Sequence, residues 1–181
     1  MLEFQKGDKT SFEKLMERNF KKVFNLIYRF VNSQEVAEDL TQEVFLKIYK
    51  AGPTYQPQSK FLTWVYQIAR NISLNELRKK NPVSLDQTMD SEDGEYQKEY
   101  ADTRTQNPFQ KVSQEEIQSM IREAVASLPE NQRMAVLLKR YENFSYEEIA
   151  ETLDCSVKAV KSLLNRAKEN LKEKLLGLME D

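Results

Sequence analysis

Apolar residues recur at helical spacing behind helix-capping signals along most of this chain. Four capping boxes pair a polar capping residue with a glutamate three positions later: Thr10 and Glu13, Asn32 and Glu35, Ser113 and Glu116, and Ser145 and Glu148. The apolar residues that follow each box are spaced so that they share one helix face. The 181 residues include only 4 glycines and 5 prolines, which is too few for the turns of a many-stranded fold. The sequence therefore predicts an all-α protein.

The composition removes several kinds of chemistry from consideration. The chain has no histidine, the commonest general base and metal ligand, and its single cysteine, Cys155, cannot form an internal disulfide or a cysteine-rich zinc site. The sequence also lacks a nucleophile–base set and a glycine-rich phosphate loop. We therefore expect a protein that is not an enzyme and that needs no metal and no cofactor.

The compartment is indicated by the absence of targeting signals. No apolar run approaches the roughly 20 residues that span a bilayer, and Met1 is not followed by a signal-peptide pattern. A lone cysteine also suits the reducing conditions of a cytosol. We therefore expect a cytoplasmic protein without stable membrane insertion.

Charge divides the chain into three parts, although the net charge of the whole is only −2. Residues 1–82 carry 14 basic and 9 acidic side chains, residues 83–105 carry 2 and 7, and residues 106–181 carry 11 and 13. The middle part lacks a helical apolar pattern, and Asn-Pro pairs mark its two ends. We predict two small helical domains, 1–82 and 113–181, joined by an acidic flexible linker, 83–112. The alternative, a long surface loop within one domain, is uncommon in compact folds.

The first domain is predicted to contain about four helices. One helix should run from Asn32 to about Lys50 and another from about Lys60 to Lys80, with a polar loop over 51–60 between them. The predicted buried faces of these two helices are Val36, Leu40, Val44 and Ile48 in the first, and Phe61, Trp64, Ile68 and Ile72 in the second.

The last two predicted helices form a helix-turn-helix. A short capped helix over 146–153, a turn of about three residues and a final helix have the spacing that places the second helix in the DNA major groove. Residues 156–174 carry six basic and two acidic side chains. If Val160 and Ala167 face inward, the outward face offers donors for phosphates and base edges. That face is Lys158, Ser162, Asn165 and Arg166, flanked by Lys161 and Lys168. The alternative interpretation is an ordinary solvated basic helix.

Two separate sets of motifs resemble one family. The stretches LPENQR at 128–133, YEEIA at 146–150, VKS at 160–162 and RAK at 166–168 are similar to the −35-binding domain of bacterial sigma factors. The stretches AEDLTQEVF at 37–45 and FLTWVYQIARN at 61–71 resemble the promoter-melting domain of the same family. A short chain with these two domains and a linker is similar to the extracytoplasmic-function (ECF) subfamily of the sigma-70 family. The resemblance implies a factor that binds core RNA polymerase, recognises −10 and −35 promoter elements and directs transcription initiation.

The predicted polymerase contact lies on the helix over 35–50. Asp39, Gln42 and Glu43 stand at i, i+3 and i+4, and so form one polar, partly anionic face. The resemblance implies that this face docks on the clamp coiled coil of the polymerase's largest subunit. The alternative is a face that contacts only solvent.

The predicted −10 contact, with melted promoter DNA, lies on the loop over 51–60 and the helix after it. The ring of Tyr55 can stack on an unstacked base, and polar side chains of the loop can bond its edge. Basic residues of the helix can follow the phosphates. The expected set is Tyr55, Gln56, Gln58, Ser59, Lys60, Gln67, Arg70, Asn71, Arg78, Lys79 and Lys80. Trp64 could act as a melting wedge, but its place beside Phe61 and Ile68 favours packing.

Several features leave more than one interpretation. Leu163 stands where the family commonly has arginine, so it removes one expected donor from the −35 contact or widens the packed face. Cys155 is interpreted as a small turn residue, with a redox role as the alternative. The linker is either a solvated tether or, as the family implies, a segment whose negative charge imitates phosphates inside the polymerase. The family also implies an anti-sigma protein that covers the exposed surfaces.

Two other classes of function remain as alternatives. A stand-alone transcription regulator would use the helix-turn-helix without the polymerase-binding face or the 55–71 surface. A helical module that binds only proteins would not need basic residues gathered on the final helix.

Overall fold

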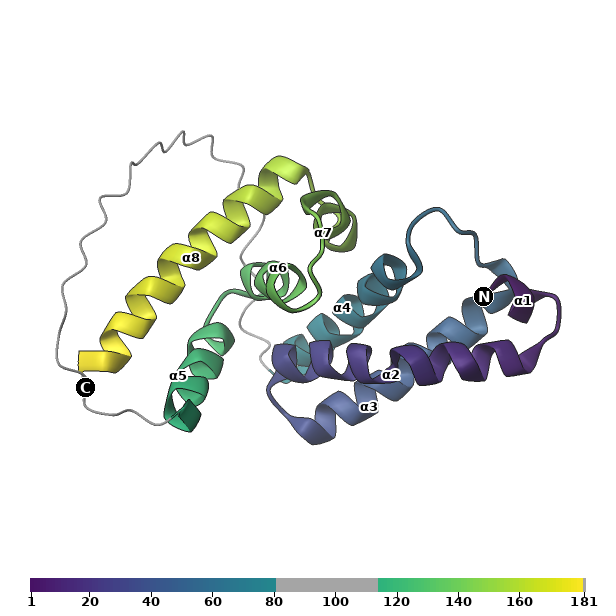
Figure 1. Ribbon diagram of the computed structural model, residues 1–181, viewed down its shortest axis with the longest axis horizontal. Coiled ribbons are helices and arrows are strands. Elements are labelled where there is room, and N and C mark those ends of the chain that lie inside the picture. Colours follow the sequence, from purple (N-terminus) through teal and green to yellow (C-terminus); the bar gives the residue numbers. More distant parts are fainter. Residues whose placement is uncertain (81–113, 181) are drawn as a thin grey trace.

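The computed structural model describes residues 1–80 and 114–180, and every helix or strand assigned in these ranges is a helix (Figure 1). The elements are α1 (Leu2–Gln5), α2 (Lys9–Val31), α3 (Gln34–Ala51), the 3-10 turn η1 (Gly52–Thr54), α4 (Phe61–Lys80), α5 (Gln114–Ala126), α6 (Glu130–Tyr141), α7 (Tyr146–Leu153) and α8 (Val157–Glu180). The predicted all-α class is therefore confirmed. The predicted linker, 83–112, and the capping box at Ser113 lie outside the described residues.

Two of the predicted capping boxes are wrong: Asp8 caps α2, and Ser33 stands at the N-cap of α3 without a side-chain capping bond. Helix α2 begins at Lys9, and the Asp8 carboxylate accepts hydrogen bonds from the backbone N–H groups of Thr10 at 2.9 Å and Ser11 at 3.3 Å. These two residues also donate their hydroxyls, and together the bonds lower the pKa of Asp8 to about 2. Asn32 does not open α3: it ends α2 in the left-handed conformation (φ 54°), which asparagine tolerates well.

The first domain packs α2, α3 and α4 against one another. The predicted face of α3 is right, with Leu40, Val44 and Ile48 buried and Val36 half-buried. The predicted face of α4 is partly wrong. Its fully buried residues include Val65, Tyr66, Ala69 and Ile72, while Phe61, Trp64 and Ile68 are half-buried at the edge. The reason is that α4 contacts α2 and α3 on one side and α7 on another, so its buried arc is wide.

The second domain contains the predicted helix-turn-helix, formed by α7 and α8. The capping box at the start of α7 is confirmed: Ser145 Oγ accepts from the Glu148 N–H at 3.2 Å, and the Glu148 carboxylate accepts from the Ser145 N–H at 2.8 Å. Asp154 turns the chain in the left-handed conformation (φ 53°). Val160 and Ala167 of α8 are fully buried, as predicted.

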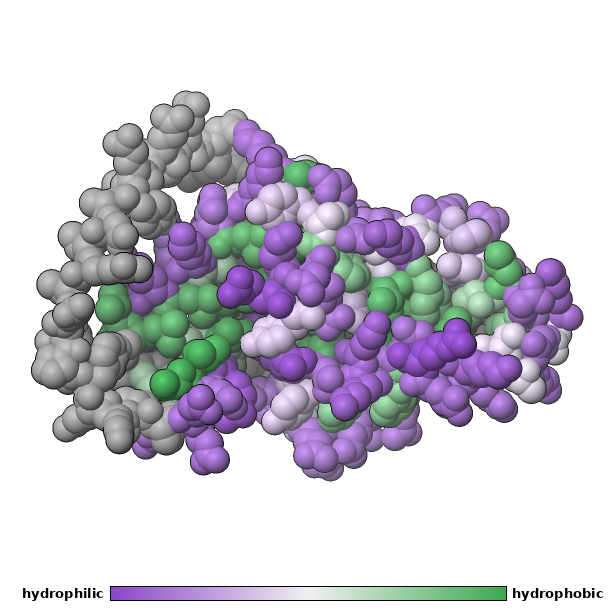
Figure 2. All heavy atoms as spheres, in the orientation of Figure 1, coloured by the Kyte–Doolittle hydropathy of each residue, from purple (hydrophilic) through white to green (hydrophobic). Residues whose placement is uncertain are grey.

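The two domains pack directly against each other. Figure 1 shows α5–α8 on the left and α1–α4 on the right, with α7 lying against α4 and α6 against α2. Their apolar interiors join in one cluster, in which Tyr66 of the first domain lies 5.5 Å from the ring of Phe144 of the second. Apolar side chains also gather on the surface between α5 and α8 (Figure 2), where Ile117, Ile121 and Leu176 are exposed.

Candidate nucleic-acid interface

The outward side of α8 carries all six residues predicted to contact the −35 element. Lys158, Lys161, Ser162, Asn165, Arg166 and Lys168 are all exposed. We call these six residues the α8 face. Because the buried side of α8 is fixed by Val160 and Ala167, the helix presents the α8 face as a rigid, mostly basic strip. Such a strip has donors for both phosphates and base edges.

The start of α7 flanks the α8 face. The Nζ of Lys161 lies 6.0 Å from the centre of the Tyr146 ring, and the Nζ of Lys139 lies 4.8 Å from the same ring. Leu163 is half-buried and packs against the core, so its side chain widens the packed side of α8. Leu163 therefore packs inside the domain, and position 163 supplies no donor to the α8 face.

The polar face predicted on α3 is solvent-exposed. Asp39, Gln42 and Glu43 all project away from the buried stripe, and Glu43 forms an ion pair with Lys47 at 3.3 Å. Leu46, one turn beyond Gln42 and Glu43, is 52% exposed. Leu46 therefore adds an exposed apolar side chain to the face that Asp39, Gln42 and Glu43 share. The sequence prediction missed Leu46, although its i+3 and i+4 spacing from the polar residues was visible.

The loop before α4 holds the predicted stacking residue against the helix. The ring of Tyr55 lies 4.8 Å from the ring of Trp64, and Phe61 lies 6.1 Å from Trp64 on its other side. Trp64 is half-buried and packs against the core, which agrees with the packing role. The neighbouring Gln56 and Gln58 are exposed, and Ser59 is half-buried.

Three of the residues predicted to contact the −10 element are instead held by the second domain. Gln67 donates its side-chain amide to the carbonyl oxygen of Glu151 on α7 at 2.6 Å. Arg70 donates to the side-chain oxygen of Asn131 on α6 at 3.0 Å, and Lys60 forms an ion pair with Glu148 at 2.8 Å. Asn71, Arg78 and Lys79 remain exposed, with Lys79 3.8 Å from Glu76, and the side chain of Lys80 is not described. The predicted −10 residues therefore divide into an exposed group and a group, Lys60, Gln67 and Arg70, that contacts the second domain.

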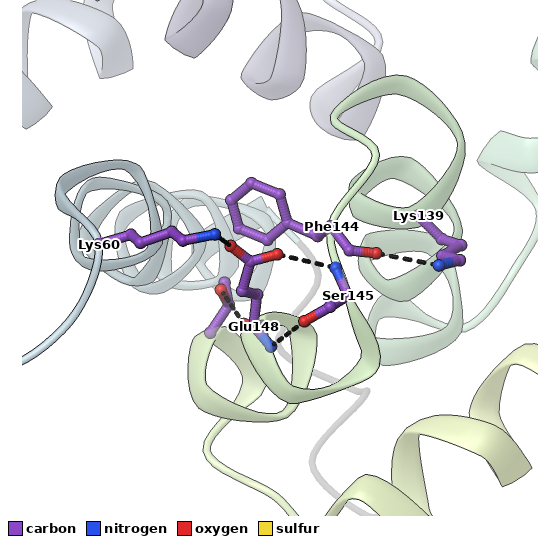
Figure 3. Close-up of polar contacts among 6 residues, drawn as sticks. Lys60, Lys139, Phe144, Ser145 and Glu148 are labelled. Atoms are coloured by element: carbon purple, nitrogen blue, oxygen red, sulfur yellow. Dashed lines mark hydrogen bonds and ion pairs between the residues drawn. The ribbon is translucent and has the colours of Figure 1, made fainter.

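Glu148 links the helix-turn-helix to the start of α4. Figure 3 shows one oxygen of its carboxylate on the Ser145 N–H and the other on Lys60. The hydrogen bond from Lys60 is the main cause that lowers the pKa of Glu148, and the same contact raises the pKa of Lys60. This contact is therefore lost as the pH falls through the pKa of Glu148 or rises through the pKa of Lys60. Lys60 is 79% exposed, so the ion pair is weak and sensitive to salt.

A buried tyrosine makes a charge-assisted polar contact between the domains. Tyr66 is fully buried, and its hydroxyl donates to the Glu142 carboxylate at the end of α6 at 2.6 Å. Burial and this hydrogen bond raise the pKa of Tyr66 well above its usual range. Hydrogen bonds to charged groups contribute about 1.5–3 kcal/mol. Sequence analysis missed this pair, because no local pattern connects residues so far apart in the chain.

Arg133, within one of the family-like motifs, also joins the domains. Its guanidinium donates to the backbone oxygen of Phe30 on α2 at 2.8 Å and lies over the Phe30 ring. It also donates to the carbonyl oxygens of Ala126 and of Leu128, the latter at 3.1 Å. Nearby, the guanidinium of Arg29 lies 4.3 Å from the centre of the Tyr141 ring. Burial lowers the pKa of Arg133, and its guanidinium is occupied by these backbone acceptors.

Cys155 lies half-buried in the turn between α7 and α8. Its N–H donates to the carbonyl oxygen of Ala150 at 3.0 Å, and burial raises the pKa of its thiol. A raised pKa lowers the fraction of reactive thiolate, which favours the structural role over the redox role.

In the part of the chain that the structure describes, no helix is long and apolar enough to cross a membrane.

Comparison with known proteins identifies both domains. Residues 15–82 match the family model for sigma-70 region 2, and residues 118–171 match that for sigma-70, region 4. The RNA polymerase sigma-H factor of Pseudomonas aeruginosa is 33% identical over 178 residues, covering 98% of this chain and 92% of that protein. The ECF RNA polymerase sigma-E factor of Escherichia coli K12 is 36% identical over 178 residues, covering 97% and 92%.

Two solved structures share the fold. The sigma factor RpoE from Bartonella quintana, crystallised with the anti-sigma factor NepR, superimposes with a TM-score of 0.66 at 24% identity and covers 91% of this chain and 96% of that one. CnrH, solved with the cytosolic domain of CnrY, gives a TM-score of 0.68 at 19% identity and covers 96% and 92%. Together with the matched regions and the curated relatives, these likenesses lead to one conclusion. The chain belongs to the ECF group of the sigma-70 family, the factors that bind core RNA polymerase, recognise −10 and −35 promoter elements and direct transcription initiation.

Proposed function

We propose that each function of this sigma factor belongs to one surface of the described chain. The domain 1–82 binds polymerase and opens the promoter, and the domain 113–181 binds the −35 duplex. The observation that carries this proposal is the α8 face, six exposed polar residues on one side of a helix whose other side is buried. In this arrangement α8 enters the major groove, Lys158 and Lys168 bind phosphates, and Asn165 and Arg166 reach base edges.

The polymerase contact is assigned to Asp39, Gln42 and Glu43. Their exposure supports the assignment, and the exposed Leu46 lies on the same face of α3. Truncating one partner of a charge pair that a complex buries costs about 2–5 kcal/mol, so a carboxylate that pairs with the polymerase in this way should have a large effect.

Polymerase pull-down tests this surface. Asp39→Arg should reduce core binding by more than tenfold, and Gln42→Ala should reduce it less, because it removes hydrogen bonds without adding a repelling charge. Glu17→Arg is the matched control: it makes the same charge change at an exposed position on α2 and should bind normally. Undiminished binding by both α3 variants would remove the assignment. Run-off transcription with core polymerase gives a second measurement. Transcripts should depend on this protein, and the α3 variants should give fewer transcripts in proportion to their loss of core binding.

The −10 contact is assigned to the loop 55–60 and α4, and we infer that it is completed only when the second domain moves off α4. Gln67 and Arg70 cannot reach melted DNA while they donate to Glu151 and Asn131. These contacts are polar and partly exposed, and the domains belong to one chain. Core polymerase and promoter DNA can therefore replace them with contacts of their own.

This role requires no covalent chemistry from the chain itself, since nucleotide addition belongs to the polymerase. We place the protein in the cytoplasm, where its polymerase and promoters are. An anti-sigma partner is supported by the two structural neighbours, each solved with a second protein, and by the exposed apolar residues Ile117, Ile121 and Leu176 of α5 and α8. The role of the acidic linker inside polymerase remains a proposal that rests on its charge alone.

A further inference from the structure

The short N-terminal helix α1 lies against the loop that leads to α4. It precedes residues 15–82, which match the sigma-70 region 2 model, so that match does not account for it. Gly7 reverses the chain after α1 with a positive φ of 99°, a conformation that glycine adopts readily. This turn brings α1 back onto the start of α2 and onto η1.

Phe4 is the apolar anchor of α1. Its ring centre lies 5.1 Å from that of Phe12 on α2 and 5.1 Å from that of Tyr49 near the end of α3, and these two rings are themselves 5.1 Å apart. Gly52 lies beneath the same ring so closely that a Cβ there would overlap the Phe4 side chain. A side chain at position 52 would therefore push the Phe4 ring out of its place, although the φ of −48° at Gly52 is open to any residue.

Gln5 carries the contact from α1 into the loop. Its side-chain amide donates to the carbonyl oxygen of Tyr55 at 2.7 Å, while the Tyr55 N–H donates to the carbonyl of Gly52 at 3.3 Å. The Tyr55 ring then lies 4.8 Å from the ring of Trp64 on α4. A continuous series of contacts thus connects α1, through Gly52 and Tyr55, to the side of α4 where the predicted −10 residues begin.

We propose that α1 is a positioning element for −10 recognition: Phe4 and Gln5 hold the loop so that Tyr55, Gln56 and Gln58 are ordered before DNA arrives. Neither Phe4 nor Gln5 needs to touch DNA in this role. Preordering a loop strengthens binding because the conformational entropy of the loop is lost on folding and not on binding. The inference rests on the proposed −10 role of the loop.

The single tryptophan of the chain reports directly on the loop. Trp64 is half-buried against Tyr55, so release of the loop should increase acrylamide quenching of its fluorescence by about twofold in the full-length protein. The variants are Phe4→Ala with Gln5→Ala, and the milder Gln5→Glu, whose carboxylate cannot donate to the Tyr55 carbonyl. Leu2→Ala, at an exposed position of the same helix, is the matched control and should quench like the unaltered protein.

The functional measurement is binding of holoenzyme to a fluorescent single-stranded −10 oligonucleotide. The double variant should weaken binding about tenfold, which corresponds to about 1.4 kcal/mol of loop ordering. Gln5→Glu should weaken it less, and core binding and −35 duplex binding should stay unchanged. Gln58→Ala, measured in the same binding assay, tests directly whether the loop contacts the −10 oligonucleotide.

The outcomes separate the inference from the proposed function. If quenching is unchanged in both α1 variants, α1 does not hold the loop and the inference is overturned. If Gln58→Ala weakens binding but the α1 variants do not, the inference fails while the −10 role of the loop stands. If Gln58→Ala has no effect either, the −10 role itself is wrong and the inference falls with it.

Discussion

The two DNA surfaces of this sigma factor differ in how the folded chain presents them. The α8 face is exposed along its whole length, and the packing of one domain alone fixes it. The −10 surface is assembled from a loop and a helix, and Lys60, Gln67 and Arg70 are occupied by the other domain. On the proposed assignments, the −35 contact is accessible in the free protein, whereas the −10 contact depends on the arrangement of the domains.

The largest expected effect should fall on the −35 surface alone. Arg166→Glu replaces a donor at the centre of the α8 face with a charge that repels phosphates, so −35 duplex binding should fall about 100-fold. Lys174→Glu makes an equivalent charge change two turns further along α8 and should cost less than threefold. The measurement is fluorescence anisotropy with a −35 duplex. Equal losses from both variants would mean that α8 binds DNA only through its overall charge.

The second-largest effect should come from a variant that weakens the contacts between the domains. Such a variant should make the −10 surface more accessible, and so more like the α8 face. Glu142→Gln with Tyr141→Ala removes the charged acceptor of the Tyr66 hydroxyl and the ring that Arg29 covers. The glutamine keeps a neutral acceptor for the Tyr66 hydroxyl, so we expect a loss of about 1.4 kcal/mol of interdomain contact. The free variant should then bind a single-stranded −10 oligonucleotide about tenfold more tightly than the unaltered protein. Its −35 duplex binding should not change.

The control for this variant is Glu151→Gln. It removes one negative charge from the same domain, but only the backbone carbonyl of Glu151 contacts the first domain. It should therefore leave −10 binding unchanged within about twofold. A gain from Glu151→Gln as large as that from the double variant would assign the effect to charge rather than to domain opening.

Smaller effects are expected at two exposed −10 residues, Asn71 and Lys79, and they should depend on the promoter in different ways. Asn71 is exposed and accepts from Arg70 at 3.3 Å, so Asn71→Ala should weaken transcription several-fold at some promoters and little at others. Lys79→Ala should weaken binding at all promoters and reduce the salt slope for single-stranded DNA by about 0.7. Run-off transcription at several promoters and a salt titration distinguish them. The same loss at every promoter from both variants would refute this distinction.

Sequence patterns predicted most of what local interactions determine. The bounds of α7, its Ser145–Glu148 capping box and the inward residues of α8 all follow from short-range spacing, and the structure confirms them. The caps of α2 and α3 were wrong by one or two positions because Asp8 competes with Thr10, and Asn32 suits the end of one helix better than the start of the next. Such choices between neighbouring polar residues depend on loop geometry that periodicity does not contain.

The contacts between the domains could not have been predicted in this way. Tyr66 and Glu142 are 76 positions apart, and Arg133 reaches Phe30 across 103. Tyr66 was assigned no role, and Arg133 was noted only as part of a family-like motif. The −10 residues were therefore predicted without the contacts that Lys60, Gln67 and Arg70 make with the second domain.

The measurement that tests this account most directly is the distance between the two domains before and after promoter binding. Fluorescent labels would be placed at the start of α3 and on α5, which lie on facing sides of the two domains (Figure 1). The variants are Glu35→Cys and Arg122→Cys, both at exposed positions, in a chain that also carries Cys155→Ser. Single-molecule energy transfer should give one short distance in the free protein and one long distance in holoenzyme bound to promoter DNA. A distance that is the same in both states, or already long in the free protein, would contradict the account.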